Sequence, residues 1–435
     1  MPANRVVVVG TTPDYVDVIR RRFPGRAIFL SHYTEGPQSN RCLHERDELF
    51  CDLNAHDEAV QILEQFLNRG RVRLTGVCCF DCESLPPAAA IAERFELPFL
   101  SVETAAICRN KHAMLEAWRW AGIPCPAGSL AGSHSDLRAF IDVHGTPAVL
   151  KPISGSGSEL VLKCSTEDEC NRACSLIMEQ LSGHPDERMY PRFAGDSSLV
   201  DPRRAILIEE FIEGDEYSCD FVIDNGNLHV LRVAKKVSKC NHVFGTTEAY
   251  ILPVQLPLGF DYWDFLNTIR KAAVVLGIDR ALCMLDFIIR DNQPVIIELS
   301  PRPGGDCLPD LMLWSGGFDI IGWTIDFAEG TNSNIPDTSK WSTLVGLRLI
   351  SSHAGTIQRL DIRKILRDPR VMECRLRHSA GHNVILPPFD YDSRVLGHVI
   401  FDPDSLENIE DECKDIASKL IVEMDNELWI KPKAS

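Results

Sequence analysis

The chain has 435 residues, with 62 Asp plus Glu against 45 Lys plus Arg, so its formal net charge is −17. At roughly 150 residues per domain, this length predicts about three domains. The acidic balance argues against nucleic acid and anionic membranes as partners, because both bind basic surfaces. Apolar runs such as Val6–Gly10 are far shorter than the roughly 20 residues that cross a bilayer. Since the N-terminus lacks the apolar core of a signal peptide, we expect a cytoplasmic protein with reduced cysteines.

The chain contains 16 cysteines, and Cys79 and Cys82 form a CxxC pair. A zinc site would usually show a second pair at similar spacing, which this sequence lacks. Buried or incidental cysteines are therefore favoured over a metal-binding or redox role.

The first hundred residues alternate strand and helix patterns. Arg5–Gly10 is a β-branched apolar run ending in glycine, which is typical of a buried parallel strand. Helices are expected at 15–23, 56–67 and 86–95, and strands at 27–30, 72–80 and 98–100. This alternation predicts right-handed βαβ units and a parallel sheet. No GxGxxG pattern follows, so the segment carries no dinucleotide-binding fingerprint.

The rest of the chain mixes helices with hairpin-linked strands. A helix is expected over Thr104–Ala121, with Lys111 near its middle, and a mobile insertion over Ser182–Arg204. Asp224–Asn227 predicts a hairpin turn, as does the pair Asp291-Asn292. Further strands are expected at 148–152, 160–163, 205–210, 216–223, 228–235, 281–290 and 294–300, and helices at 166–181 and 262–276. Beyond about residue 342 we expect short strands and a final helix near 405–424.

A small-residue loop follows the predicted strand that ends at Lys151-Pro152. Its sequence, Ser154-Gly155-Ser156-Gly157-Ser158, lets backbone N–H groups approach a phosphate closely, and the hydroxyls add further donors. The chain has no GxxxxGK[ST], so this loop is not a P-loop. Phosphate binding is favoured over a flexible linker because strands flank the loop on both sides.

An acidic stretch follows the next buried strand. The strand from Ala205 runs into Glu209, Glu210, Glu213, Asp215 and Glu216, and the chain turns at Gly214. A strand end can pair with an adenine edge, and a carboxylate just beyond it can accept from ribose hydroxyls. A solvated acidic turn is the alternative.

Two carboxylates interrupt the apolar strands near residue 290. Asp286 and Glu298 lie on hairpin-related strands, so we expect them side by side, where like charges need a cation between them. Bound phosphates and hard oxygen ligands describe a Mg²⁺ site. Ser300 shares the face of Glu298, and Arg302 could hold a phosphate or carboxylate. A buried salt bridge between Arg302 and one of the acids is the alternative. A fourth feature, Lys235-Lys236 followed by a polar loop to Glu248, could cover a site.

Together these segments resemble the ATP-grasp superfamily, in its carboxylate–amine ligase branch, over roughly residues 1–425. The motifs that carry the resemblance are Arg109–Lys111 with 121–126, Val149–Pro152 with the Gly/Ser loop, Glu209–Glu216, and Ile297–Gly305. The family implies an α/β and α+β architecture, with a Rossmann-like pre-ATP-grasp domain of parallel strands, central ATP-grasp subdomains and a small C-terminal domain. The expected boundaries are 1–105 for the N-terminal domain, 106–204 and 205–335 for the two ATP-grasp subdomains, and 336–435 for the C-terminal domain.

The resemblance also implies roles for individual residues. Lys111 and Lys151 would contact ATP, and Ser156, Gly157 and Ser158 would close over its phosphates. The adenine and ribose would meet Glu209, Glu210, Ile212 and Glu216. Asp286, Glu298 and Ser300 would ligate Mg²⁺ or Mn²⁺, although the family usually has Asn at the position of Ser300. Arg302 would assist phosphoryl transfer or anchor a carboxylate, with Glu248 and Gly305 near the substrates.

The expected reaction joins a small-molecule carboxylate to an amine through an acylphosphate, with an amino acid as one substrate. A carboxylase that activates bicarbonate, a small-molecule kinase and a catalytically weak nucleotide-binding protein are the alternatives. A homodimer is common in this branch of the family.

Overall fold

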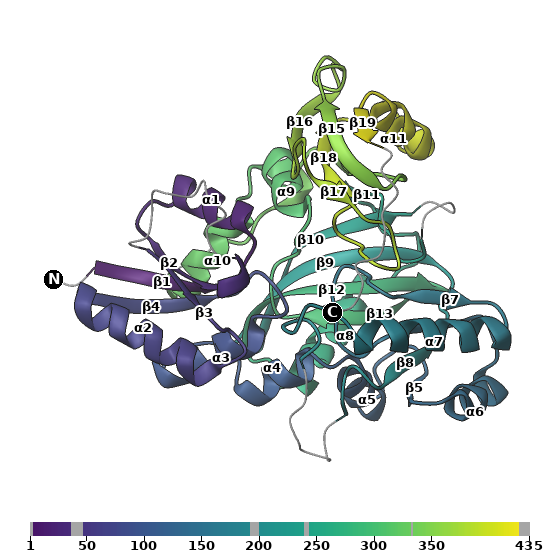
Figure 1. Cartoon of the computed structure of the whole chain (residues 1–435), viewed down its shortest axis with the longest axis horizontal. Helices are drawn as coiled ribbons and strands as arrows, with labels where there is room; N and C mark the ends of the chain where they lie inside the picture. Colours follow the sequence, from purple (N-terminus) through teal and green to yellow (C-terminus); the bar gives the residue numbers. More distant parts are fainter. Residues whose placement is uncertain (1–2, 36–46, 192–199, 239–242, 332–333, 426–435) are drawn as a thin grey trace.

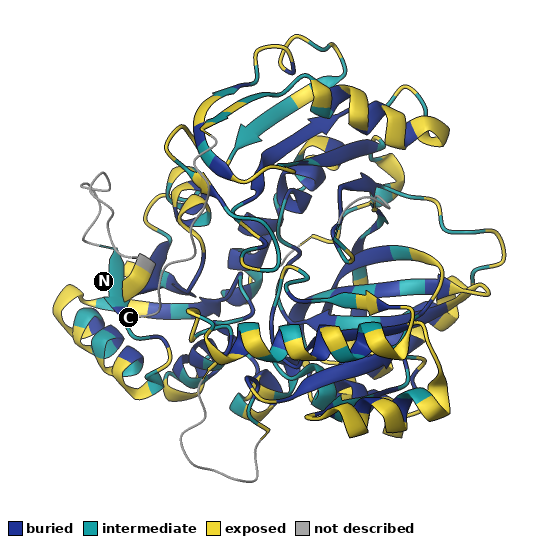
Figure 2. Ribbon diagram, turned by 45° about the vertical axis from the view of Figure 1, so that its right-hand side comes forward, coloured by how far each residue is buried: buried dark blue, intermediate teal, exposed yellow. Residues whose placement is uncertain are grey.

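The computed structural model describes residues 3–35, 47–191, 200–238, 243–331 and 334–425. Three lobes surround a central region: an N-terminal lobe, a lobe containing β5–β8, and a C-terminal lobe (Figure 1). Strands are largely buried, whereas the helices expose their outer faces (Figure 2). Among the described residues, no helix combines the length and apolar character required to cross a membrane.

The N-terminal lobe is built on a parallel four-stranded sheet in the order β3-β2-β1-β4. Because the valines of β1 are buried on both faces, helices must cover the sheet on each side. Its elements are β1 (Ala3–Val9), α1 (Pro13–Arg22), β2 (Ala27–His32), β3 (Glu48–Cys51), α2 (His56–Gly70), β4 (Val72–Cys78) and α3 (Leu85–Arg94). The predicted parallel sheet is confirmed. The strand predicted at 98–100 is wrong: these three residues, which begin with a proline, lie in a loop.

The single helix predicted over Thr104–Ala121 is also wrong. Two helices, α4 (Val102–Cys108) and α5 (Lys111–Trp120), are separated at Asn110. Asn110 has extended backbone angles, and its side chain accepts a hydrogen bond from the N–H of Ala113. This N-cap satisfies an otherwise unpaired donor of α5. Lys111 therefore begins a helix instead of lying in the middle of one.

A second four-stranded sheet, in the order β5-β8-β6-β7, forms another lobe. Its elements are β5 (Gly128–Ala131), α6 (His134–His144), β6 (Ala148–Pro152), β7 (Leu162–Cys164), α7 (Glu167–Ser182) and β8 (Ile206–Glu210). Helices α6 and α7 pack against this sheet (Figure 1). Within the predicted insertion, residues 192–199 lie outside the described residues, while Tyr190 and Arg203 are buried.

The largest sheet has eight strands in the order β13-β12-β9-β10-β11-β14-β18-β16. The strands are β9 (Asp215–Asp224), β10 (Asn227–Val237), β11 (Ala249–Leu252), β12 (Arg280–Arg290), β13 (Gln293–Ser300), β14 (Leu344–Ile350), β16 (Val371–Leu376) and β18 (Val395–Phe401), and the helices are α8 (Tyr262–Val275), α9 (Leu308–Gly316) and α10 (Ile320–Ala328). Both predicted hairpins form. Asn225 and Asp291 have positive φ in their turns. Because β14 pairs with β11, this sheet continues across the boundary expected at residue 335.

The C-terminal lobe adds a three-stranded sheet of β15 (Gly355–Asp361), β17 (Asn383–Val384) and β19 (Ile421–Asp425), with helix α11 (Ile409–Ser418). The final helix predicted near 405–424 therefore ends earlier than expected. Residues 421–425 pair with β15, and their backbone groups are satisfied by strand bonding instead of helix bonding.

Candidate active site

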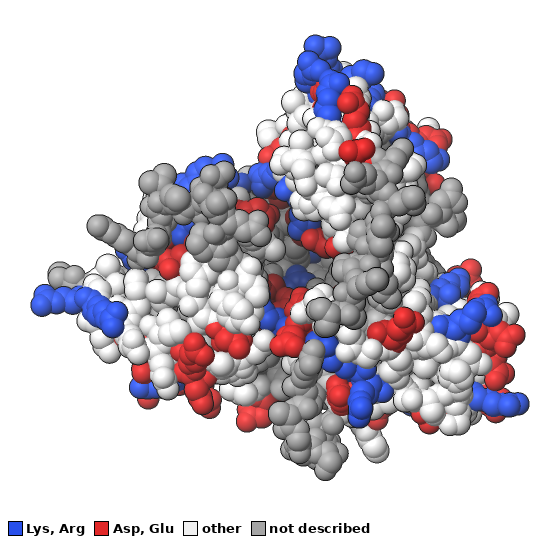
Figure 3. Space-filling view, viewed as in Figure 1, with Lys and Arg blue, Asp and Glu red and all other residues white. Residues whose placement is uncertain are grey.

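A cavity lies between the β5–β8 sheet and the β9–β13 part of the large sheet, and most of the predicted site residues line it. Figure 3 shows acidic and basic side chains together in the hollow between the lobes. The predicted residues that line the cavity are Lys111, Lys151, Ser156, Gly157, Ser158, Glu209, Glu210, Ile212, Glu216, Asp286 and Glu298. The structure therefore brings together residues from α5, both sheets and the Gly/Ser loop.

Asp286 and Glu298 are directly opposite each other in the antiparallel β12–β13 ladder, as the hairpin predicted. Lys111 donates to Glu298 Oε1 at 2.6 Å and to the Gly155 carbonyl at 3.0 Å. Burial raises the pKa of Glu298, but Lys111, Lys151 and Arg302 outweigh burial and hold this pKa below its ordinary value. Glu298 is therefore ionised at neutral pH.

Lys236 neutralises the other carboxylate. Its Nζ lies 3.1 Å from Asp286 Oδ2 and also contacts Glu216. Burial lowers the pKa of Lys236, but Asp286 and Glu216 more than compensate and raise it above the ordinary lysine value. Sequence reasoning noticed Lys236 only as part of a polar loop. The available signal was its position near the end of β10, because the neighbouring strand β9 carries the acidic residue Glu216.

Lys151 belongs to a third ion pair. Its Nζ lies 2.7 Å from Glu209 Oε2, and both side chains are buried. The pair joins β6 to β8 on the inner wall of the cavity. The N–H groups of Glu210 and Phe211 donate to the carbonyls of Ala127 and Pro147. The N–H of Glu210 is therefore already used within the protein.

Apolar and aromatic side chains form the walls between these charges. Val149, Val161, Ile288 and Ile297 line the cavity together with Phe211 and Phe244. Lys163 lies over the Phe211 ring, 3.6 Å from its centroid. Such a slot can accept a flat aromatic base, and sequence reasoning had not selected these residues.

The turn after Ile212 depends on a glycine. Gly214 has φ near +150°, and a Cβ there would lie 2.4 Å from the Ile289 carbonyl oxygen. Only glycine fits this close approach between the turn and β12.

Four predicted residues lie outside the cavity lining: Ser300, Arg302, Glu248 and Gly305. Ser300 is buried beneath the N-terminal lobe, where the Cys82 thiol donates to its Oγ at 3.6 Å. Arg302 Nε donates to Cys82 Sγ at 3.1 Å. No ion pair joins Arg302 to Asp286 or Glu298 among the described contacts, although its charge lowers the pKa of Glu298. Glu248 is buried, and its backbone bonds Val237 and Arg348.

The Cys79–Ser84 loop of the N-terminal lobe therefore reaches the site. Ser156 Oγ donates to Glu83 Oε1 at 3.2 Å, joining this loop to the Gly/Ser loop. Burial and the neighbouring Glu83 raise the pKa of Asp81 to about 6. Cys79 and Cys82 are buried thiols, and burial raises the pKa of Cys79.

A buried ion pair supports the segment that follows β13. Arg232 Nε and Nη2 donate to Asp220 Oδ2 and Oδ1 at 2.9 and 3.0 Å, and neither side chain is exposed. Asp220 also accepts from the N–H of Gly304 at 3.1 Å. This contact fixes the backbone beside Arg302. Charged residues within the apolar strands β9 and β10 were the sequence signal for it.

Several known proteins have sequences or structures similar to this chain. Residues 144–310 match the model of the ATP-grasp domain family. The chain contains an ATP-grasp domain. The chain is 29% identical over 212 residues to a D-alanine–D-alanine ligase of Delftia acidovorans, covering 47% of the chain and 57% of that protein. It is 25% identical over 224 residues to dapdiamide A synthase of Enterobacter agglomerans, covering 51% and 49%. The chain thus spans about half the length of these curated relatives.

The fold likeness extends further. A crystal structure of an L-amino acid ligase from Bacillus licheniformis superposes with a TM-score of 0.75 at 19% identity, covering 98% of this chain and 100% of that one. The ATP-grasp fold expected from the motifs is therefore confirmed across nearly the whole chain.

Proposed function

We propose that the protein is an ATP-dependent ligase that joins the carboxylate of one small molecule to the amine of another, with an amino acid among its substrates. The observation that carries the proposal is the pair Asp286 and Glu298, which face each other in a cavity also lined by Lys111, Lys151 and Lys236. A nucleoside triphosphate with a divalent cation matches these charges, because the carboxylates can bind the cation and the lysines can bind the phosphates. The ligase relatives support the choice of reaction.

The nucleotide would lie with its base between the apolar walls and its phosphates toward the Gly/Ser loop. Glu209, Glu210 and Ile212 would border the base, and Glu216 would accept from the ribose. Lys111, which already touches both the loop and Glu298, would contact the phosphates. Ser156–Ser158 would add backbone and hydroxyl donors.

A magnesium ion fits the residues present. Within the described part of the chain, no group of three or more His, Cys, Asp or Glu side chains could hold a metal alone. Asp286 and Glu298 supply two carboxylates, and Mg²⁺ commonly binds through one or two carboxylates together with phosphates and water. When bound, the ion would offset negative charge on the phosphates during transfer.

The substrates would occupy the space beside the Cys79–Ser84 loop. A substrate carboxylate oxygen would attack the γ-phosphorus of ATP, and ADP would leave. The amine would then attack the acyl carbon of the acylphosphate, releasing inorganic phosphate and a proton. Arg302 would hold the carboxylate or the transferred phosphoryl group, and Asp81 with Glu83 would attract a substrate ammonium group. The protein would mainly position these groups and exclude water.

The test is a phosphate-release screen with ATP, Mg²⁺ and pairs of carboxylates and amines, followed by mass spectrometry of the products. We expect phosphate release to require both substrates and to yield a product with one new amide bond. Release that requires bicarbonate and no amine would instead identify a carboxylase. A stable phosphorylated product would identify a kinase, and nucleotide binding without turnover for any pair would contradict the ligase proposal.

A further inference from the structure

The segment between β17 and β18 connects the C-terminal lobe to the lobe that carries the Gly/Ser loop. Tyr391 in this segment is only 8% exposed and packs in the same core as Leu160 and Tyr190, which belong to the β5–β8 lobe. In Figure 1 the yellow-green chain that precedes β18 leads down from the C-terminal lobe. A residue of the C-terminal lobe is thus part of the hydrophobic core of another lobe.

The loop that Tyr391 touches has an unfavourable backbone. Ser158 and Leu160 have φ of 59° and 56°, values that residues other than glycine seldom adopt. Such conformations persist where surrounding contacts hold them. The loop therefore requires external support to keep this shape over the cavity.

Tyr391 supplies part of that support. Its side chain is buried in the same core as Leu160. Burial raises the pKa of its hydroxyl overall, and the Leu160 backbone is close enough to that hydroxyl to lower this pKa in part. The adjacent Glu159 is held from its own lobe, because Tyr190 donates to its Oε2 at 3.0 Å and His184 lies 3.2 Å from its Oε1. The loop is thus held from two sides, and one of them is the C-terminal lobe.

A second contact from the same segment reaches the loop that contains Gly245 and Thr246. Arg394 is buried and donates to Thr246 Oγ1 at 2.8 Å and to the Tyr391 carbonyl at 3.4 Å. Gly245, next to Thr246, lines the cavity so close to the loop that a Cβ there would lie 3.1 Å from Ser158 Cβ. Tyr391 and Arg394 therefore hold two neighbouring loops together.

The segment itself is fixed to the C-terminal lobe. Asp390 accepts from the N–H groups of Asp392 and Ser393 at 2.8 and 3.0 Å. Ser393 Oγ bonds the backbone of Ile385. These bonds hold the segment to the residues that follow β17.

We propose that Tyr391 is a positioning residue that holds the Gly/Ser loop closed over the phosphates of a bound nucleotide, with Arg394 as its support. The C-terminal lobe thereby sets nucleotide affinity without touching the nucleotide. The inference rests on the proposed function to the extent that the occupant of the cavity is ATP.

The experiment compares Tyr391→Phe with the wild-type full-length protein. Phenylalanine keeps the packing and removes only the hydroxyl group that approaches the Leu160 backbone, so we expect ATP and ADP affinity, measured by calorimetry with Mg²⁺, to fall roughly 3- to 10-fold. The KM for ATP should rise by the same factor, while the KM values for both substrates stay unchanged. Tyr262→Phe is the matched control, since Tyr262 is 42% exposed on α8.

The outcomes separate this inference from the proposed function. Unchanged nucleotide affinity in Tyr391→Phe would overturn the role of Tyr391, provided that the wild-type protein binds ATP. A wild-type protein that binds no nucleotide would overturn the proposed function and this inference with it. If Tyr391→Phe does not fold, Arg394→Lys provides the second test, and an unchanged KM for ATP in that variant would likewise overturn the inference.

Discussion

Asp286 lies opposite Glu298 in the β12–β13 ladder, and each carboxylate contacts a lysine from a different element. Lys111 comes from the start of α5 and Lys236 from the end of β10. The two lysines offset the repulsion that adjacent carboxylates would otherwise experience. Binding of a metal and phosphates would allow each lysine to exchange its carboxylate partner for a phosphate oxygen. The charges of the two carboxylates and the two lysines can therefore be neutralised both with and without a bound nucleotide.

Replacement of Glu298 tests the role of this pair in phosphoryl transfer. We expect Glu298→Gln to lower the rate of ADP formation by about 100-fold or more, because the charge that holds the cation is lost while the shape is kept. Steady-state assays at saturating ATP would measure the change. Glu213→Gln is the control, since Glu213 is exposed in the same acidic stretch. A Glu298→Gln variant as active as this control would contradict the metal assignment.

Replacement of Ser300 should have a smaller effect on turnover than replacement of Glu298. Its hydroxyl is buried against Cys82, so we expect Ser300→Ala to lower turnover far less than Glu298→Gln does. Measurement of turnover against Mg²⁺ concentration would detect a change in metal affinity. A loss as large as that of Glu298→Gln would mean that Ser300 moves into the site when a nucleotide binds.

Lys236→Met should affect the protein most when no ligand is bound. The lysine is buried between Asp286 and Glu216, and its loss leaves two neighbouring carboxylates without their cation. We expect a lower melting temperature without ligand, and a larger rise on addition of Mg²⁺ and ADP than in the wild type. Thermal unfolding with and without ligand measures both. Lys235→Met is the control, because Lys235 pairs with Asp215 at the surface. Equal ligand-induced shifts in both variants would contradict the exchange described above.

Much of the architecture could be predicted from the sequence because local signals and global fold agree. The β-branched run at Val6–Val9 and the Asn-Gly and Asp-Asn turns determine strands and hairpins from neighbouring residues alone. The break at Asn110 could not be distinguished from a continuous helix, because both flanks have helical periodicity. The end of α11 is set by pairing with β15, which is a long-range contact.

The same distinction applies to the site. Asp286 and Glu298 stand out because charge in an apolar strand is costly. Glu83 and Tyr391 carry no such signal, since each reaches the site only through the packing of lobes that are far apart in sequence. The apolar walls formed by Ile288 and Ile297 are also indistinguishable from ordinary core until the cavity is seen.

Asp81 predicts a pH dependence. Its pKa is raised to about 6 by burial and by Glu83, above the ordinary aspartate value of about 4. Between these values the folded protein binds more protons than the unfolded chain, so this group's contribution makes stability fall as the pH rises from about 4 to about 6. We expect Asp81→Asn to raise the melting temperature relative to the wild type more at pH 7.5 than at pH 4. Thermal scans at both values would measure this difference, and an equal effect at both would contradict it.

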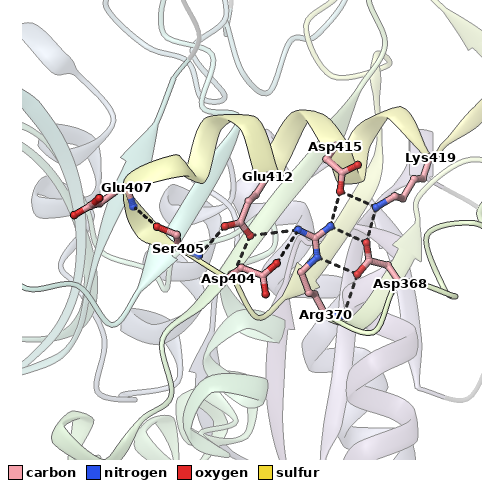
Figure 4. Close-up of polar contacts among 8 residues, drawn as sticks. All are labelled: Asp368, Arg370, Asp404, Ser405, Glu407, Glu412, Asp415 and Lys419. Carbon is pink, nitrogen blue, oxygen red and sulfur yellow. Dashed lines mark hydrogen bonds and ion pairs between the residues drawn. The ribbon is translucent and has the colours of Figure 1, made fainter.

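Arg370 joins α11 to the chain that precedes β16. Its guanidinium lies 2.8 Å from Asp368 and 2.5 Å from Asp415, with Asp404 and Glu412 at 3.5 and 3.4 Å (Figure 4). Lys419 also contacts Asp368 and Asp415, at 2.6 and 2.7 Å. The hydrogen bond from Arg370 is the largest cause of a pKa of Asp368 well below its ordinary value.

A folded pKa below the unfolded one contributes stability that is fully present above the ordinary aspartate pKa and is lost as the pH falls through the lower pKa of the folded state. We therefore expect Arg370→Met to lower the melting temperature clearly at pH 7.5, and the difference from the wild type to shrink at pH 2. Arg363→Met is the control, because the Arg363 side chain is 71% exposed although it also pairs with an aspartate. Circular dichroism at both pH values measures the differences. A deficit in Arg370→Met that is independent of pH would show that the arginine acts through packing of its stem, because its charge pairing with the surrounding carboxylates disappears when they are protonated.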